Sequence, residues 1–259
     1  MADVVIVGSS RGCHHYVSEV LRDSITHFTG VEYSIFNCAI GGKFINSNSC
    51  AAESIMDRYT PKLLIFEVSE EELSGANSIK DMEFSAVNYN NNRFVKQYLD
   101  ALGLEERVKM LSSMYRFNRK ALFIVASFNK KSKGSLGYQP LNKKMTIHQK
   151  HNALREDSHR DIDKYSLNNF TRVLQTAQDK EIPLIIVSSP KFAPADNNEF
   201  LAKTCRQFGV PYIELYNLEL FNHHPEYFQD VRHLNDDGAH VYTELFFETL
   251  KPYLTPLME

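Results

Sequence analysis

Short apolar runs alternate with longer amphipathic stretches along this 259-residue chain. The apolar runs are rich in β-branched residues and end at polar, Gly or Pro positions, which is typical of strands. This alternation predicts βαβ units and an α/β fold with a mostly parallel, five-stranded sheet. The predicted strands are Val4–Val7, Val31–Phe36, Leu63–Val68, Leu184–Val187 and Tyr212–Leu215, and the predicted helices lie near residues 13–24, 46–58, 164–180, 197–208 and 237–251.

A long interruption separates the third and fourth predicted strands. It covers residues 70–163, which is too long for an ordinary connection and therefore needs its own structure. Residues 93–102 and 104–128 are predicted helical, whereas 129–150 is polar and contains glycine. We interpret the segment as a helical insertion or lid within a single domain of residues 1–259. The lysines of its polar part at positions 130, 131, 133, 143 and 144 suit either a solvated loop or an acidic glycan.

Composition narrows the function classes. A net charge of −3 gives no basic field for nucleic acid, and 43% hydrophobic residues suffice for an enclosed core. The four cysteines form neither a metal-type pair nor a dense disulfide pattern, so buried free thiols are expected. No apolar run approaches the roughly 18 residues of a membrane span. The first predicted strand starts so near residue 1 that an upstream export signal or anchor would fit, and the compartment stays open, as does the oligomeric state.

The first candidate site element follows the first strand. Val4–Val7 runs into Gly8-Ser9-Ser10-Arg11-Gly12, which places Ser10 at the carboxyl edge of the sheet, where open α/β folds bind ligands. A serine there becomes a nucleophile if a base takes its proton. Taken alone, the segment is equally compatible with Ser9 and Ser10 acting only as helix caps.

The same turn is similar to the glycine-rich turn of short-chain dehydrogenases. That turn needs a further glycine at position 14, where this chain has His14. The dehydrogenases also use a tyrosine followed four residues later by lysine, and none of the 13 tyrosines here has that spacing. The sequence therefore disfavours hydride transfer.

The second candidate element precedes the last predicted helix. Asp230 and His233 are three residues apart, a spacing that in a tight turn sets a carboxylate against one imidazole nitrogen and leaves the other free. His233 then becomes an oriented base. The alternative is a pair on a surface loop, which is the expectation for His223, His224 and His240.

Together these blocks resemble the SGNH (GDSL-type) hydrolase superfamily over most of the chain. Its Gly-Asp-Ser block appears as Gly8-Ser9-Ser10, and its Asp-x-x-His block as Asp230 and His233. The resemblance implies a three-layer α/β/α sandwich of flavodoxin-like type with Ser10 as nucleophile. It also implies an oxyanion hole from the N–H groups of Ser10 and Gly42, with Gly41 as a close rival.

The third block departs from the family pattern. Where the family carries an oxyanion asparagine, this chain has Glu71, and a carboxylate cannot donate a hydrogen bond unless protonated. Asn77 and Asn118 in the insertion are candidate replacements. The run 70–72 is expected to be a solvated helix start.

Three residues are candidates for contact with substrate: Arg11, Asn118 and Tyr138. Arg11 would pair with an anionic group, although a surface arginine in a first helical turn is the ordinary case. Tyr138 would line the cleft if the insertion folds over the sheet edge.

The resemblance implies a serine esterase that hydrolyses small acyl esters, with acetyl groups on a carbohydrate as the leading substrate. No metal or cofactor is needed for such chemistry. Two alternatives stay open: an O-acyltransferase that acts on a glycan, and a non-catalytic glycan-binding protein that kept the fold. The separation of Ser10 and His233 in the folded chain discriminates catalysis from binding.

Overall fold

The computed structural model describes residues 1–74, 78–118, 134–146, 161–192 and 198–254. Its centre is a five-stranded parallel sheet, as the alternating pattern predicts, with the strand order β2-β1-β3-β4-β5. The chain adds β2 on one side of β1 and β3 on the other, so the strand order reverses between β1 and β3, where an α/β sheet opens a crevice at its carboxyl edge. The strands are β1 (Val4–Val7), β2 (Ile35–Asn37), β3 (Leu63–Glu67), β4 (Leu184–Ser188) and β5 (Tyr212–Glu214).

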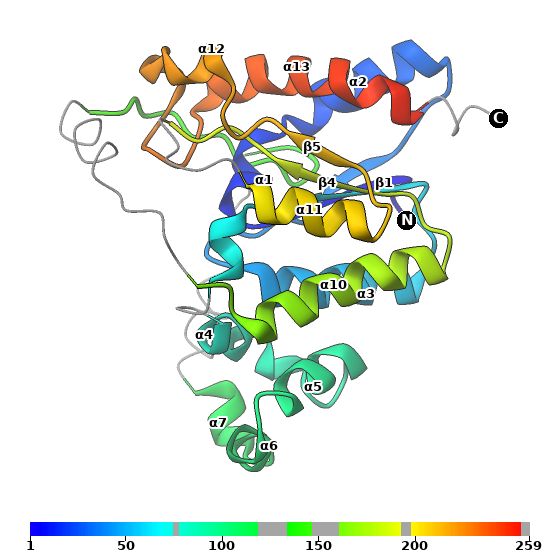
Figure 1. The fold of residues 1–259 in the computed structure, drawn as a ribbon, viewed down its shortest axis with the longest axis vertical. Helices are drawn as coiled ribbons and strands as arrows, with labels where there is room; N and C mark the ends of the chain where they lie inside the picture. Colours follow the sequence, from blue (N-terminus) through cyan, green and yellow to red (C-terminus); the bar gives the residue numbers. More distant parts are fainter. Residues whose placement is uncertain (75–77, 119–133, 147–160, 193–197, 255–259) are drawn as a thin grey trace.

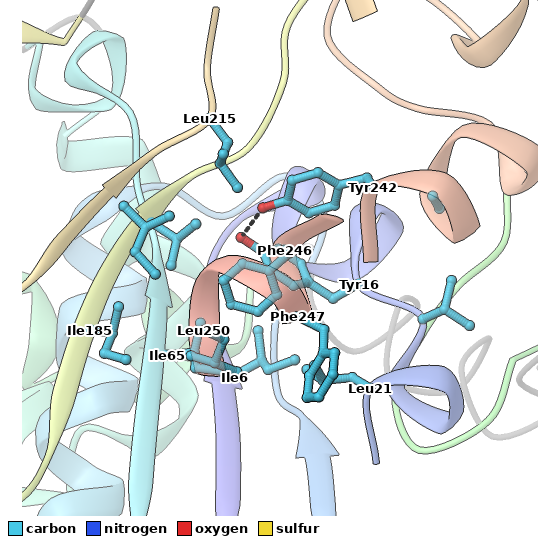
Figure 2. Packing of buried hydrophobic residues seen from close by; sticks show 14 of the residues in the cluster. Ile6, Tyr16, Leu21, Ile65, Ile185, Leu215, Tyr242, Phe246, Phe247 and Leu250 are labelled. Carbon is cyan, nitrogen blue, oxygen red and sulfur yellow. Dashed lines mark hydrogen bonds between the residues drawn. The ribbon is translucent and has the colours of Figure 1, made fainter. Parts of the chain in front are cut away.

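Helices cover both faces of the sheet and complete three layers (Figure 1). Alternate strand residues point to opposite faces, so Val4 and Ile6 belong to one buried cluster, and Val5 and Val7 to the other. The first face carries α1 (Ser10–His15), α2 (Ser18–Thr29), α12 (Glu219–Asn222) and α13 (Asp236–Leu254). The second carries α3 (Ile45–Arg58), α10 (Lys164–Asp179) and α11 (Glu199–Gln207). Figure 2 shows Tyr16, Tyr242 and Phe246 packed in the first core.

Residues 70–118 of the insertion after β3 are mainly helical in their described part, as predicted, whereas residues 134–146 contain no helix or strand. It packs on α3 around a small core of its own that includes Met82, Tyr98 and Leu99. The predicted helix over 104–128 is divided in its described part, because the Ser112 side chain accepts a hydrogen bond from Tyr115 N and caps a new helix. The elements are η1 (Glu70–Leu73), α4 (Ser78–Glu83), η3 (Phe84–Asn88), α5 (Arg93–Asp100), α6 (Leu104–Met110) and α7 (Ser113–Phe117).

The structure corrects two boundaries near the N-terminus. β2 begins at Ile35 rather than at Val31, which follows the left-handed Gly30 that ends α2. The single helix predicted near 13–24 is two helices, since the backbone is extended at Tyr16 and Val17. Val17 N donates to Thr243 Oγ1 of α13, 2.9 Å away, so a tertiary contact stabilises this break.

The last helix, α13, begins at Asp236, next to the start predicted near residue 237. Asn235 Oδ1 accepts a hydrogen bond from Gly238 N at 3.0 Å, which satisfies one of the free N–H groups of the first turn. A 3₁₀ turn, η4 (Pro225–Tyr227), precedes it. The chain between η4 and α13 therefore forms a short, fixed turn, and this turn contains Asp230 and His233.

Candidate active site

Ser10 is the first residue of α1, directly beyond the carboxyl end of β1. The glycines around it permit close packing of three chain segments. A Cβ atom at Gly8 would lie 2.8 Å from Glu67 Cβ, and one at Gly12 would lie 2.7 Å from Ala39 Cβ. Larger residues at these two positions would push β1 and α1 away from their neighbours, so the small-residue turn fixes the place of Ser10.

The structure brings the three residues of the expected triad together. Ser10 Oγ lies 2.7 Å from His233 Nε2, and His233 Nδ1 lies 2.9 Å from Asp230 Oδ1. Asp230 Oδ1 also accepts the backbone N–H groups of Arg232 and His233, at 2.9 and 3.0 Å. A carboxylate on Nδ1 leaves Nε2 as the nitrogen that could accept a proton from Ser10.

The charge of Asp230 matches this geometry. Partial burial opposes ionisation of Asp230, but the hydrogen bond and charge of His233 and the two backbone donors outweigh it and lower the pKa of the carboxyl. Asp230 is therefore ionised near neutral pH, and a carboxylate in this position would hold the proton of His233 on Nδ1 and would stabilise an imidazolium if Ser10 were to react.

The loop after β2 lies beside Ser10. Asn37 Nδ2 donates to Gly12 O at 2.8 Å, and Asn37 Oδ1 accepts from Ala39 N at 3.0 Å. A Cβ atom at Gly41 would lie 3.8 Å from Ser10 Cβ, whereas one at Gly42 would have no described atom within 4 Å. Gly41, the rival of the expected Gly42, is therefore the glycine that packs against Ser10.

Arg11 of α1 and Glu72 of the segment after β3 are both buried, which corrects two expectations. Arg11 is 4% exposed rather than on the surface, and Glu72 is 7% exposed rather than solvated. The Arg11 guanidinium lies 3.5 Å from Glu67, 3.9 Å from Glu71 and 3.4 Å from Glu72. Lys191 Nζ also contacts Glu71, at 3.2 Å. The side of the site that departs from the family motif is thus a cluster of buried charges.

The surroundings shift the pKa values of Glu71 and Glu72 in opposite directions. Burial raises the pKa of Glu72 to about 8, and Arg11 only partly opposes this shift. Burial also disfavours ionisation of Glu71, but Arg11 and Lys191 outweigh it and lower its pKa. Glu71 is therefore charged at neutral pH, whereas Glu72 is mostly protonated.

The other expected substrate contacts lie away from Ser10. Asn118 is exposed at the end of α7. Tyr138 is 6% exposed within the first core, and its hydroxyl donates to Asp236 Oδ1 at 2.6 Å. Neither lines the cavity at Ser10. Asn77 lies outside the described residues, as do the lysines at 130, 131 and 133, whereas those at 143 and 144 are exposed.

Two histidines next to Ser10 were not singled out by the sequence reasoning. His14 Nδ1 donates to Gln139 O at 2.7 Å, and its ring meets that of His233 edge to face, with 5.7 Å between centroids. His15 is fully buried and contacts both Ser189 and Leu234. The available signal was their position, because the two adjacent histidines follow Ser10 by four and five residues in the same helix.

A cavity of about 100 Å³ opens beside Ser10. The β1–α1 turn, the start of α3, the segment after β3, α10 and the histidine turn all contribute to its wall. Its lining residues are mainly polar: Ser9, Ser10, Arg11, Phe44, Ile45, Asn46, Glu71, Glu72, Ser74, Ser166, Arg232 and His233. Small-molecule pockets are usually about 300–1,000 Å³, so only a small group fits here.

The described residues contain neither a metal-binding cluster nor a membrane-spanning helix. No group of three or more His, Cys, Asp or Glu side chains among them is arranged to hold a metal ion. In the same part of the chain, no helix combines the length and apolar character that crossing a membrane requires. The four cysteines are free thiols there, and Cys13, Cys50 and Cys205 are buried as expected, with Cys38 half-buried.

Comparison with known proteins identifies the fold. No family model and no curated protein matches the sequence. Among solved structures, the psychrotrophic esterase EstA from Pseudoalteromonas sp. aligns at 9% identity over 97% of each chain, with a TM-score of 0.52. TesA aligns at 11% identity over 96% of this chain and 98% of its own, with a TM-score of 0.51.

A lipase/acylhydrolase from Enterococcus faecalis aligns at 10% identity over 98% of this chain and 97% of its own, with a TM-score of 0.48. At such identities the likeness concerns the fold. The parallel sheet, its two helical layers and the alignment with EstA and TesA show that this chain has the three-layer α/β/α fold of the SGNH (GDSL-type) hydrolases.

Proposed function

We propose that this protein is a serine ester hydrolase. The observation that carries the proposal is the contact of Ser10 Oγ with His233 Nε2 at 2.7 Å, while Asp230 holds the opposite ring nitrogen. His233 removes the proton of Ser10 as its oxygen attacks the ester carbonyl, and returns the proton to the departing alcohol. Water then attacks the acyl-enzyme with His233 again as base, which releases the carboxylic acid and restores Ser10.

Backbone N–H groups stabilise the oxyanion in this proposal. Ser10 N provides one donor, and the loop that contains Gly41 and Gly42 provides the second. The position of Gly41 against Ser10 favours its N–H over that of Gly42. One such donor contributes about 3 kcal/mol to transition-state stabilisation. Glu71 is ionised at neutral pH and does not replace the missing asparagine donor.

The cavity supports a short acyl group as the substrate's acid part. Its volume of about 100 Å³ suits an acetyl group, and a long acyl chain would need an apolar channel. We propose an acetyl ester of a carbohydrate as the substrate class, because the lining is rich in hydroxyl, amide and charged groups. An acyltransferase would use the same acyl-enzyme with a glycan hydroxyl in place of water. A purely binding role is disfavoured by the Ser10–His233 contact.

A chain-length series of activated esters tests the proposal. We expect hydrolysis of p-nitrophenyl acetate, with kcat/KM falling at least ~10-fold from acetate to octanoate because the cavity excludes the longer chain. A fluorophosphonate should label Ser10, located by peptide mass spectrometry. Ser10→Ala should abolish both hydrolysis and labelling, and Ser24→Ala on α2 is the matched control with wild-type behaviour. Hydrolysis retained in Ser10→Ala would exclude this mechanism.

A further inference from the structure

His15 occupies an unusual place for a histidine. It ends α1 five residues after the nucleophile and is 0% exposed, whereas its neighbour His14 lies at the open edge of the site. Both ring nitrogens of His15 have partners. Nε2 lies 3.0 Å from Leu234 N, and Nδ1 lies 2.8 Å from Ser189 Oγ. Leu234 directly follows His233 in the chain.

The partners of His15 fix its tautomer. A backbone N–H can only donate, so Nε2 must be the nitrogen without a proton. In the neutral ring Nδ1 then carries the proton and donates to Ser189 Oγ. Burial, with the nearby His233, Arg11 and His14, lowers the pKa of His15 well below its usual value, so the neutral ring is the stable form.

Ser189 links His15 to Glu67 through hydrogen bonds. Its hydroxyl donates to Glu67 Oε1 at 2.8 Å, and its backbone N–H donates to the same carboxylate at 3.1 Å. Tyr16 donates its hydroxyl to Glu67 Oε2, and Arg11 Nε lies 3.5 Å from Oε1. The Tyr242 hydroxyl donates a hydrogen bond to the Tyr16 hydroxyl at 3.1 Å. Figure 2 marks this contact with a dashed line.

Glu67 is therefore the fixed end of this chain. It is 0% exposed at the carboxyl end of β3, directly behind the turn that carries Ser10. Gly8 is required beside it, since a Cβ there would come within 2.8 Å of Glu67 Cβ. A buried carboxylate with several donors is costly to move, because each lost partner leaves an unpaired polar group.

We propose that His15 is a positioning residue for the base, holding the backbone at Leu234 so that His233 stays aligned on Ser10. The turn is then fixed at two points. Asp230 accepts the N–H groups of Arg232 and His233, and His15 accepts the next N–H in the chain, that of Leu234. The inference rests on the proposed esterase function and assigns His15, Ser189 and Glu67 a role in it.

Two substitutions of similar chemistry and different reach test His15. His15→Gln can place a carbonyl oxygen near the position of Nε2, whereas the shorter His15→Asn cannot. A displacement of about 1 Å at a catalytic group can cost roughly 100-fold in rate. We expect kcat on p-nitrophenyl acetate to fall about 10- to 100-fold in His15→Asn, with KM within about twofold of wild type. His15→Gln should recover most of that loss.

Amide hydrogen exchange at Leu234 provides a readout independent of catalysis. The amide should be protected in the wild type and in His15→Gln, and exposed to exchange in His15→Asn. If the wild type shows this protection pattern but hydrolyses no ester, the proposed function fails while the structural role of His15 stands. Wild-type kcat in His15→Asn overturns the positioning role.

Ser189→Ala is a second variant that leaves the acceptor of Leu234 in place. It removes the partner that keeps the proton on Nδ1, so we expect a smaller loss, about threefold to tenfold in kcat, with KM unchanged. It decides the case if His15→Asn does not fold. A wild-type kcat in Ser189→Ala would then contradict the proposal.

Discussion

The two sides of the cleft around Ser10 differ in how completely their polar groups are paired. On the histidine side, Asp230, His233 and Ser10 form one chain of hydrogen bonds between 2.7 and 2.9 Å. On the β3 side, Arg11 lies within 4 Å of three carboxylates, those of Glu67, Glu71 and Glu72. Among the described residues, Arg11 Nη1, Glu72 Oε2 and Ser69 Oγ on that side are buried without a hydrogen-bond partner.

The two sides therefore favour different chemistry. The hydrogen bonds of the histidine side would suit proton transfer, because each donor has a defined acceptor. On the β3 side the ionised Glu71 lines the cavity next to the place where an oxyanion would form, which opposes the chemistry unless Arg11 and Lys191 balance its charge. The rate of the proposed hydrolysis therefore depends on Arg11 and Lys191 as well as on the triad, although less strongly.

The largest expected effect concerns the paired side. Asp230→Asn keeps the shape of the side chain but can donate to Nδ1, which would leave the proton of His233 on Nε2, facing Ser10. We expect kcat to fall roughly 10²- to 10⁴-fold with a small change in KM. Steady-state kinetics on p-nitrophenyl acetate measure this. An unchanged kcat would mean that His233 does not need Asp230, and the contrast between the two sides would be lost.

A smaller effect in the opposite direction is expected on the β3 side. Glu71 lines the cavity with Ser10 and is ionised, so Glu71→Gln removes a negative charge near the developing oxyanion. We expect kcat to rise about threefold to thirtyfold, as charge interactions of about 1–2 kcal/mol are typical at partly screened sites.

Lys191→Met is the matched opposite of that change. It removes the cation that lies 3.2 Å from Glu71, so kcat should fall by a similar factor. Both variants are compared at the same ionic strength because salt screens such effects. If Glu71→Gln and Lys191→Met shift kcat in the same direction, charge is not the cause.

The same contrast explains what the sequence could predict. The fold was predictable because the period of apolar residues and the strand lengths are local properties of the chain. Asp230 and His233 were predictable as a pair since three residues in one turn determine their contact. The partners of His15 and Arg11 were not predictable, because they are distant in the sequence. Leu234 is 219 residues from His15, and Glu72 is 61 residues from Arg11. No local pattern encodes such contacts.

Burial was misjudged for the same reason. Arg11 and the acidic run after β3 have the composition of a solvated surface, and charged residues are rarely fully buried unless paired. Each is buried only because the other is present. A sequence pattern examined one segment at a time therefore assigns both to solvent, and the pairing becomes visible only once β1 and β3 lie side by side in the sheet.

The smallest expected effect tests the raised pKa of Glu72 through stability. The pKa of the Glu72 carboxyl is about 8 in the folded protein and about 4.3 in the unfolded chain. Between these values the folded state binds the extra proton, so the contribution of Glu72 to stability is complete below about pH 4 and is lost as the pH rises through about 8. Glu72→Gln resembles the protonated form and cannot lose a proton.

The melting temperature of Glu72→Gln should therefore equal that of the wild type near pH 4 and exceed it by at least about 2 °C at pH 8.5, given roughly 2–4 °C per kcal/mol in a chain of this size. Gln keeps an oxygen that accepts from Ser9 Oγ, which holds the local contact constant. Glu32→Gln, at an exposed position, is the control and should show no such divergence. Parallel melting curves for Glu72→Gln and wild type across this range would mean that Glu72 is already charged beside Arg11. The β3 side would then be a balanced ion cluster rather than the less completely paired side of the cleft.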